Sequence, residues 1–246
     1  VTLRAETLAT GLNDVTDVAL APDAWILVAE RAGRIRVYRD GALQTDPAAT
    51  LAETLTARGE LLAVAVDPQF AANRWVYVAH TAAARPGSER PLEFRITRFQ
   101  ETGGTLVNQV TLLAGVPASS DRAAAALRFG PDGKLYAAFD DGGDERAQGD
   151  LASFNGKVMW LNPDGTTPAD QAGSTPVLAT DFRSPRGLGW SPDGSVLWVC
   201  DARADGSERL TPVAVTGNRP MRARSRAPFG LPAPFGIGGA ASYTTS

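Results

Sequence analysis

One short pattern recurs along this chain and limits what the chain can fold into. It consists of a strand, a turn built on Pro-Asp and a second strand that ends near an acidic residue. Its copies read APDAWILVAE (21–30), FGPDGKLYAAF (129–139) and SPDGSVLWVCD (191–201). Proline holds φ near −65° and glycine tolerates positive φ, so Pro-Asp-Gly is a tight-turn sequence. The repeated unit therefore predicts antiparallel sheet built from similar modules.

The clearest module lies between residues 121 and 165. Residues 127–129, 135–139 and 157–161 read as short apolar strands, and Pro-Asp-Gly turns follow the first and the third. Between the second and third strands lies an acidic loop, residues 140–150. Its carboxylates suit calcium, but a solvated loop that joins two strands explains the same residues, and the spacing is not that of an EF-hand.

The turn prolines set the scale of the repeat. Pro22, Pro68, Pro131 and Pro192 lie roughly 46 to 63 residues apart, close to the ~40–50 residues of a four-stranded propeller blade with loop insertions. No stretch has a convincing helical period. We therefore expect an all-β chain, a β-propeller of four-stranded blades, with about four blades within residues 1–211. The expected blades lie near residues 8–45, 58–115, 121–165 and 176–215. Residues 212–246 read as an irregular Arg/Pro/Gly-rich tail or as the start of a further blade.

Composition excludes several classes of protein. Of the 246 residues 43% are hydrophobic and 21% are charged, with a net charge of −3, which is typical of a globular domain. No apolar run approaches the ~20 residues that span a bilayer. The single cysteine excludes an intrachain disulfide and a cysteine metal cluster. The arginines of residues 219–226 have no interleaved aromatic residues, so we expect no nucleic-acid partner.

Five phrases, in order, carry a resemblance to a known family. They are VAERAGRIRVYRDG (28–41), LLAVAVDPQFAANRWVYVAHT (61–81), LRFGPDGKLYAAFDDGGD (127–144), GKVMWLNPDGTTPAD (156–170) and RSPRGLGWSPDG (183–194). The chain resembles the soluble glucose/sorbosone (aldose sugar) dehydrogenases that depend on pyrroloquinoline quinone (PQQ). These are six-bladed propellers, about two blades longer than this chain. The resemblance implies PQQ and calcium as cofactors, a sugar or other alcohol as substrate, and a periplasmic or secreted location. The start at Val1, without Met or a signal-like segment, fits a processed form and a trimmed chain equally.

The resemblance also implies where the site residues lie. For catalysis it points to Asp121 and to Arg122, which stands where the family has its catalytic histidine. For cofactor binding it points to Gly59, in place of a stacking glutamine, to Arg183, and to Ser184, in place of an asparagine.

Two further family motifs are altered in this chain. The motif H-R-N-P-Q-G becomes Phe182-Arg183-Ser184-Pro185-Arg186-Gly187, so Arg186 replaces a glutamine. The motif E-H-G-P, whose backbone carbonyls hold calcium in the family, becomes Asp201-Ala202-Arg203-Ala204. The implied metal residues are therefore Asp201, Arg203 and Ala204.

The replaced histidine leaves two functions open. A general base needs a titratable group near working pH, and arginine is always protonated. The single histidine, His80, ends an expected strand and reads more readily as a hydrogen-bonded surface residue than as a base. One hypothesis is a quinone-dependent oxidoreductase of sugars or alcohols with a degraded catalytic site. The alternative is a non-catalytic propeller that binds a protein or a small ligand.

Overall fold

The structure, a computed structural model, is a four-bladed all-β propeller, as the turn pattern predicted. It describes residues 4, 6–52, 59–88, 90–119, 123–171, 174–215, 221–222 and 229–231. Two short helices are described over their full length, α2 (Phe70–Asn73) and the 3-10 helix η1 (Glu145–Gln148), each of four residues. None of the described helices is long and apolar enough to cross a membrane.

The first two blades use the first half of the chain. The first has β1 (Val15–Leu20), β2 (Ile26–Glu30), β3 (Arg34–Arg39) and β4 (Ala42–Leu43) in that order, with β5 (Ala49–Thr50) also paired to β3. The second has β6 (Leu61–Val66), β7 (Trp75–Ala83), β8 (Leu92–Thr102) and β9 (Thr105–Ala118). Every pairing in these two sheets is antiparallel.

The other two blades follow the same plan. The third has β10 (Ala125–Phe129), β11 (Leu135–Phe139), β12 (Lys157–Leu161) and β13 (Val177–Thr180), with β17 (Met221–Arg222) parallel to β13. The fourth has β14 (Pro185–Trp190), β15 (Val196–Ala202), β16 (Glu208–Ala214) and β18 (Phe229–Leu231). One expectation was wrong: residues 176–180 do not begin the fourth blade, because β13 pairs with β12. The division after residue 211 stays a prediction, since most of the tail lies outside the described residues and β16 runs across the division.

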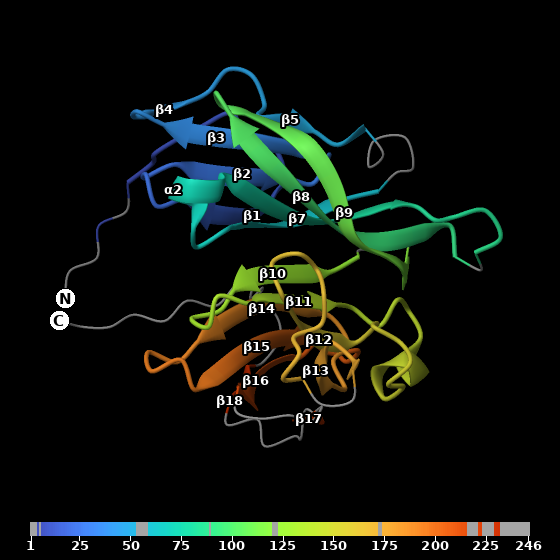
Figure 1. The fold of residues 1–246 in the computed structure, drawn as a ribbon. Coiled ribbons are helices and arrows are strands. Elements are labelled where there is room, and N and C mark those ends of the chain that lie inside the picture. Colours follow the sequence, from blue (N-terminus) through green and yellow to red (C-terminus); the bar gives the residue numbers. More distant parts are fainter. Residues whose placement is uncertain are drawn as a thin grey trace.

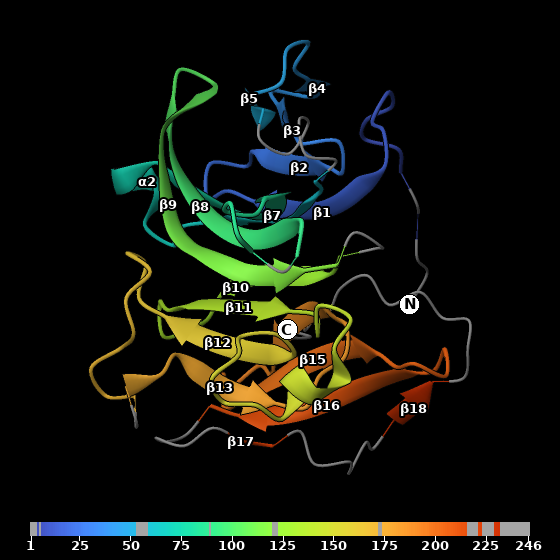
Figure 2. The ribbon, with the colours of Figure 1, turned by 90° about the vertical axis from the view of Figure 1, so that its right-hand side faces the viewer.

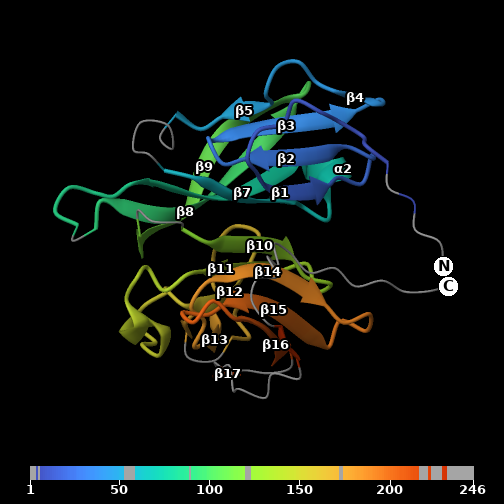
Figure 3. The same ribbon diagram turned by 180° about the vertical axis from the view of Figure 1, so that it is seen from behind.

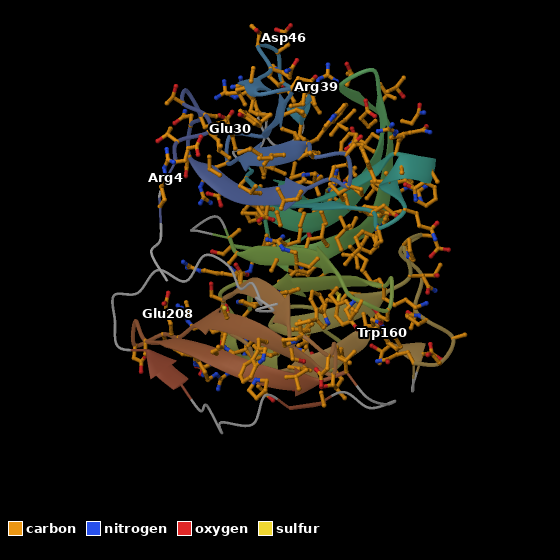
Figure 4. All side chains as sticks on the ribbon, turned by 90° about the vertical axis from the view of Figure 1, so that its left-hand side faces the viewer. Arg4, Glu30, Arg39, Asp46, Trp160 and Glu208 are labelled. Atoms are coloured by element: carbon orange, nitrogen blue, oxygen red, sulfur yellow. The ribbon has the colours of Figure 1, made fainter. Side chains whose placement is uncertain are left out.

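The first strand of each blade lies beside the first strand of the next, so β1, β6, β10 and β14 form the inner side of the propeller. Figure 1 shows β1 to β9 in the upper half of the molecule and β10 to β18 in the lower half, and the view from behind in Figure 3 agrees. In Figure 2 the long curved strands β8 and β9 of the second blade face the third blade. Figure 4 places Glu30 and Arg39 in the first half, and Trp160 and Glu208 in the second.

Three apolar clusters hold consecutive blades together. They join the first blade to the second, the second to the third, and the third to the fourth; none of the three described clusters joins the fourth to the first. Between the second and third blades, the rings of Phe94 and Phe139 stack with centroids 4.7 Å apart. An inner strand such as β6, with sequence LLAVAV, is nearly continuous in apolar residues because neighbouring sheets cover both of its faces.

The repeated turns share one geometry. Gly133, Gly165 and Gly194, the glycines of three Pro-Asp-Gly turns, have φ of +73°, +85° and +72°. In each turn the aspartate Oδ1 accepts the backbone N–H two residues later, as Asp132 does from Lys134 at 3.1 Å. Each turn is therefore stabilised locally by its own aspartate and its own glycine.

A polar contact also joins three blades near the inner strands. The Arg128 guanidinium on β10 donates to both carboxylate oxygens of Asp17 on β1, at 2.7 Å each. Asp17 Oδ2 also accepts the backbone N–H of Val64 on β6 at 2.9 Å. A two-pronged arginine–carboxylate pair restricts the geometry on both sides, so this contact fixes the relative position of the first three blades.

Candidate functional site

The first candidate cavity lies at the inner strands and has a volume of about 530 Å³. It is lined by Val15, Thr16, Arg31, Glu60, Leu62, Ala123, Ala124, Ala125 and Arg186. Arg31 is already neutralised, because it pairs with Glu60 at 3.1 Å and with Asp14 at 2.9 Å. Arg186, from β14, makes no such pair among the described residues. We call this space the axial cavity.

A second cavity, of about 400 Å³, adjoins the first through Arg186, which lines both. Its other lining residues are Ser119, Asp140, Asp141, Gly143, Arg183 and Ser184. We call it the side cavity. The structure thus brings two of the expected cofactor residues, Arg183 and Ser184, to one space. It also adds Asp140 and Asp141, which sequence reasoning had treated as part of the acidic loop.

Asp140 is a buried carboxylate at the end of β11. Its Oδ2 accepts the N–H of Ala124 at 2.7 Å and its Oδ1 accepts that of Gly142 at 2.8 Å. Burial raises the pKa of Asp140 to about 6, and the two backbone donors and nearby Arg183 oppose that rise. The one signal in the sequence was its place directly after the apolar strand LYAAF.

The rest of the acidic loop is held by its own backbone. Asp141 accepts the N–H of Gly143, Asp144 that of Arg146, and Asp150 that of Ala152. The described residues contain no group of three or more His, Cys, Asp or Glu side chains placed to hold a metal ion. The solvated-loop interpretation therefore explains these carboxylates better than calcium binding does.

Asp201 is fully engaged with protein donors. Its Oδ1 accepts the backbone N–H groups of Arg183 and Ser184, at 3.0 and 2.7 Å. Its Oδ2 accepts Arg203 at 3.1 Å and Arg209 at 3.3 Å. The side chain therefore positions the segment before β14, and little of its acceptor capacity is left for a metal.

The remaining metal residues lie in the turn after β15. The backbone carbonyl of Arg203 accepts the N–H of Gly206 at 3.2 Å, and Ala204 is exposed at the tip of this turn. Calcium binding through the backbone carbonyls of this loop stays a prediction.

Gly59 does not leave room for a side chain. A Cβ at this position would overlap the carbonyl oxygen of Thr81 and lie 2.9 Å from its carbonyl carbon. The neighbouring Glu60 reaches the axial cavity instead, where Arg31 holds it. A stacking side chain therefore cannot extend from residue 59 unless the backbone moves.

The two expected catalytic residues, Asp121 and Arg122, lie outside the described residues. Ala123, which follows them, lines the axial cavity. The sequence predicts that these two residues converge with Arg183 near the propeller axis, and this stays a prediction. His80 is fully buried, not on the surface as expected, and its Nε2 lies 3.0 Å from Thr97 Oγ1. Its burial on β7, away from the lining of both cavities, gives no support to a role as a base.

Comparison with known proteins identifies the family. Residues 12–218 match the family described as Glucose / Sorbosone dehydrogenase. The chain belongs to this family. It is 29% identical over 164 residues to quinoprotein glucose dehydrogenase B of Acinetobacter calcoaceticus, a match that covers 56% of this chain and 34% of that protein.

Solved structures agree with the family assignment. The PQQ-bound aldose sugar dehydrogenase of Streptomyces coelicolor matches with a TM-score of 0.75 and 26% identity, over 87% of this chain and 64% of that one. A putative oxidoreductase (glucose dehydrogenase) of Thermus thermophilus matches with a TM-score of 0.82 and 28% identity, over 98% and 76%. The chain spans about half or less of the curated relatives that it matches.

Proposed function

We propose that this chain is a quinone-dependent sugar or alcohol dehydrogenase by descent whose catalytic site is degraded. In this proposal the two adjoining cavities still bind a small polar ligand but do not oxidise glucose. The observation that carries it is the contrast between two positions expected to bind the cofactor, Arg183 and Gly59. Asp201 holds Arg183 at the side cavity, whereas Gly59 has no room for the stacking side chain.

The described residues fit only part of the family's cofactor. PQQ carries carboxylates, and the guanidinium groups of Arg183 and Arg186 are suitable partners for them. Bound PQQ would supply a two-electron acceptor. The stacking position at Gly59 does not fit, and Asp201 is occupied by four N–H donors. The described residues therefore do not make a complete site for the quinone and its calcium.

Proton removal is the second deficit. The base position is Arg122, which cannot accept a proton. Asp140 has a pKa near that of histidine, but both its oxygens already accept backbone N–H groups. Loss of general-base catalysis alone costs about 10²- to 10⁴-fold in rate. The further loss of the stacking contact supports the expectation that little activity is left.

A dye-linked assay of the 246-residue chain with glucose, PQQ and calcium tests this proposal. We expect no appreciable turnover from the unmodified chain. An Arg122→His variant that gains activity shows that the rest of the site is intact and that the base alone was missing. Robust turnover by the unmodified chain overturns the proposal.

The alternative, a propeller that binds a ligand without chemistry, is favoured by the missing space at Gly59. Titration of the chain with PQQ and calcium, followed by quinone absorbance, separates the two. Quinone binding without turnover supports the degraded dehydrogenase, whereas no quinone binding by either the wild-type chain or Arg122→His supports the alternative.

A further inference from the structure

Two arginines line the side cavity, beside the carboxylates of Asp140 and Asp141. Arg183 precedes β14 and Arg186 is its second residue, and both line this cavity. Within the described part of the chain, the Arg183 guanidinium makes no hydrogen bond or ion pair. That of Arg186 makes one weak hydrogen bond, from Nε to Ser184 Oγ at 3.3 Å. Most of their N–H donors are therefore available to a ligand.

The carboxylates in the same cavity already take part in hydrogen bonds with the protein. Both oxygens of Asp140 accept backbone N–H groups, as shown above. Asp141 accepts from the Gly143 N–H at 3.0 Å through Oδ1, and from Gln148 Nε2 at 2.9 Å through Oδ2. The side cavity thus combines engaged carboxylates with unengaged guanidinium groups. It offers a ligand more spare donors than spare acceptors.

The axial cavity has the same bias. Its charged lining residues within the described part of the chain are Arg31, Glu60 and Arg186. The first two pair with each other, so Arg186 is the one of the three that makes no ion pair within the described residues. Because Arg186 lines both cavities, a ligand in either one meets its positive charge.

We propose that Arg186, together with Arg183, selects a sugar or alcohol ligand that carries an anionic group. Where the resembled family has glutamine, this chain has a permanent cation, and a guanidinium binds carboxylate or phosphate oxygens in pairs. A neutral sugar would leave that cation without a partner. The inference rests on the proposed function in one respect, that the cavities bind a sugar or alcohol, and it concerns binding only.

Isothermal titration calorimetry of the 246-residue chain at low salt tests it, with glucose, glucuronate and glucose 6-phosphate as probes. We expect at least one anionic probe to bind about tenfold more tightly than glucose, because hydrogen bonds to charged groups are stronger than those to neutral groups. The Arg186→Gln variant should lose this preference, so that the anionic probes bind no more tightly than glucose does. The matched control is Arg85→Gln, which removes an exposed arginine that lines neither cavity and should change nothing. Comparison of the two anionic probes distinguishes a carboxylate ligand from a phosphate.

Each outcome bears on the proposal. Equal affinity for all three probes, or an anion preference that persists in Arg186→Gln, overturns it and leaves the degraded-dehydrogenase proposal standing. Binding of none of the three probes overturns both. If Arg186→Gln weakens PQQ binding but not glucuronate binding, Arg186 serves the quinone and the inference is wrong.

Should the glutamine variant fail to fold by circular dichroism, Arg186→Lys should keep the anion preference. The preference of the wild type should also fall steeply with added salt, and its persistence at high salt contradicts an electrostatic origin.

Discussion

Asp201 Oδ1 accepts the backbone N–H of Ser184 at 2.7 Å, which ties the end of β15 to the segment that leads into β14. The same oxygen accepts the N–H of Arg183 at 3.0 Å. These two residues begin the sequence Arg183-Ser184-Pro185-Arg186, which carries both guanidinium groups of the cavities. One buried carboxylate therefore positions the part of the site that the family resemblance picked out.

Replacing Asp201 by Ala should destabilise the protein strongly. The substitution leaves two backbone N–H groups and the half-buried Arg209 without their acceptor. Removing one partner from a buried ion pair typically costs about 3–5 kcal/mol. Urea unfolding should show a loss of that order. Asp205→Ala, in the exposed turn after β15, is the control and should have little effect; equal losses in both variants would contradict a positioning role for Asp201.

The Asp17–Arg128 contact should couple the first and third blades energetically. A double-mutant cycle of Asp17→Ala and Arg128→Ala should give a coupling energy of about 1–3 kcal/mol, because the pair is two-pronged and its carboxylate is mostly buried. The comparison pair is Arg74–Asp23, which is 2.9 Å apart with side chains 41% and 38% exposed. For this pair we expect a coupling energy of about 0.5 kcal/mol or less. Equal coupling energies in the two cycles would contradict the prediction that the Asp17–Arg128 pair stabilises the packing of the blades.

A side chain at residue 59 should be poorly tolerated. Gly59→Ala places a Cβ against the backbone carbonyl of Thr81, and overpacking of this kind costs about 1–3 kcal/mol. Gly149 provides the matched control: its φ is −96°, and an added Cβ would lie 3.8 Å from its nearest neighbour, Asp181 Oδ1. Thermal unfolding should show a lower Tm for the first variant only. If both alanine variants keep the wild-type Tm, residue 59 could carry a stacking side chain after all.

Asp140 should contribute a pH dependence of stability with an unusual sign for a carboxylate. Its pKa is raised from 3.8 to about 6 in the folded protein, so the folded state binds its proton more tightly than the unfolded state. Its stabilising contribution is therefore fully present below pH 3.8 and is lost as the pH rises through about 6. The difference in unfolding free energy between wild type and Asp140→Asn should shrink from about pH 4 to about pH 7. A carboxyl NMR titration of Asp140 with a midpoint near its ordinary value of 3.8 would contradict this.

Local chemistry was readable from the sequence because it depends on neighbours in the chain. The Pro-Asp-Gly turns work through residues two positions apart, as Asp132 and Lys134 show, and strands such as LLAVAV are apolar enough to indicate burial on both faces. All-β class and blade-sized modules followed from these patterns, whereas the family was recognised from the resemblance of five longer phrases. The motif also pointed to Arg183, which the structure places in the lining of the side cavity.

Contacts between distant segments had to come from the tertiary structure. Arg128 and Asp17 are 111 residues apart, and no local pattern links them. Asp140 looked like one of several loop carboxylates until the fold buried it beside Ala124 and Arg183. The lack of space at Gly59 depends on Thr81 of another strand. The packing of the blades sets how deeply a side chain such as Asp140 is buried, and thereby its pKa and the space around it. The modules could therefore be predicted from local sequence, whereas the arrangement of the cavities depended on contacts between blades.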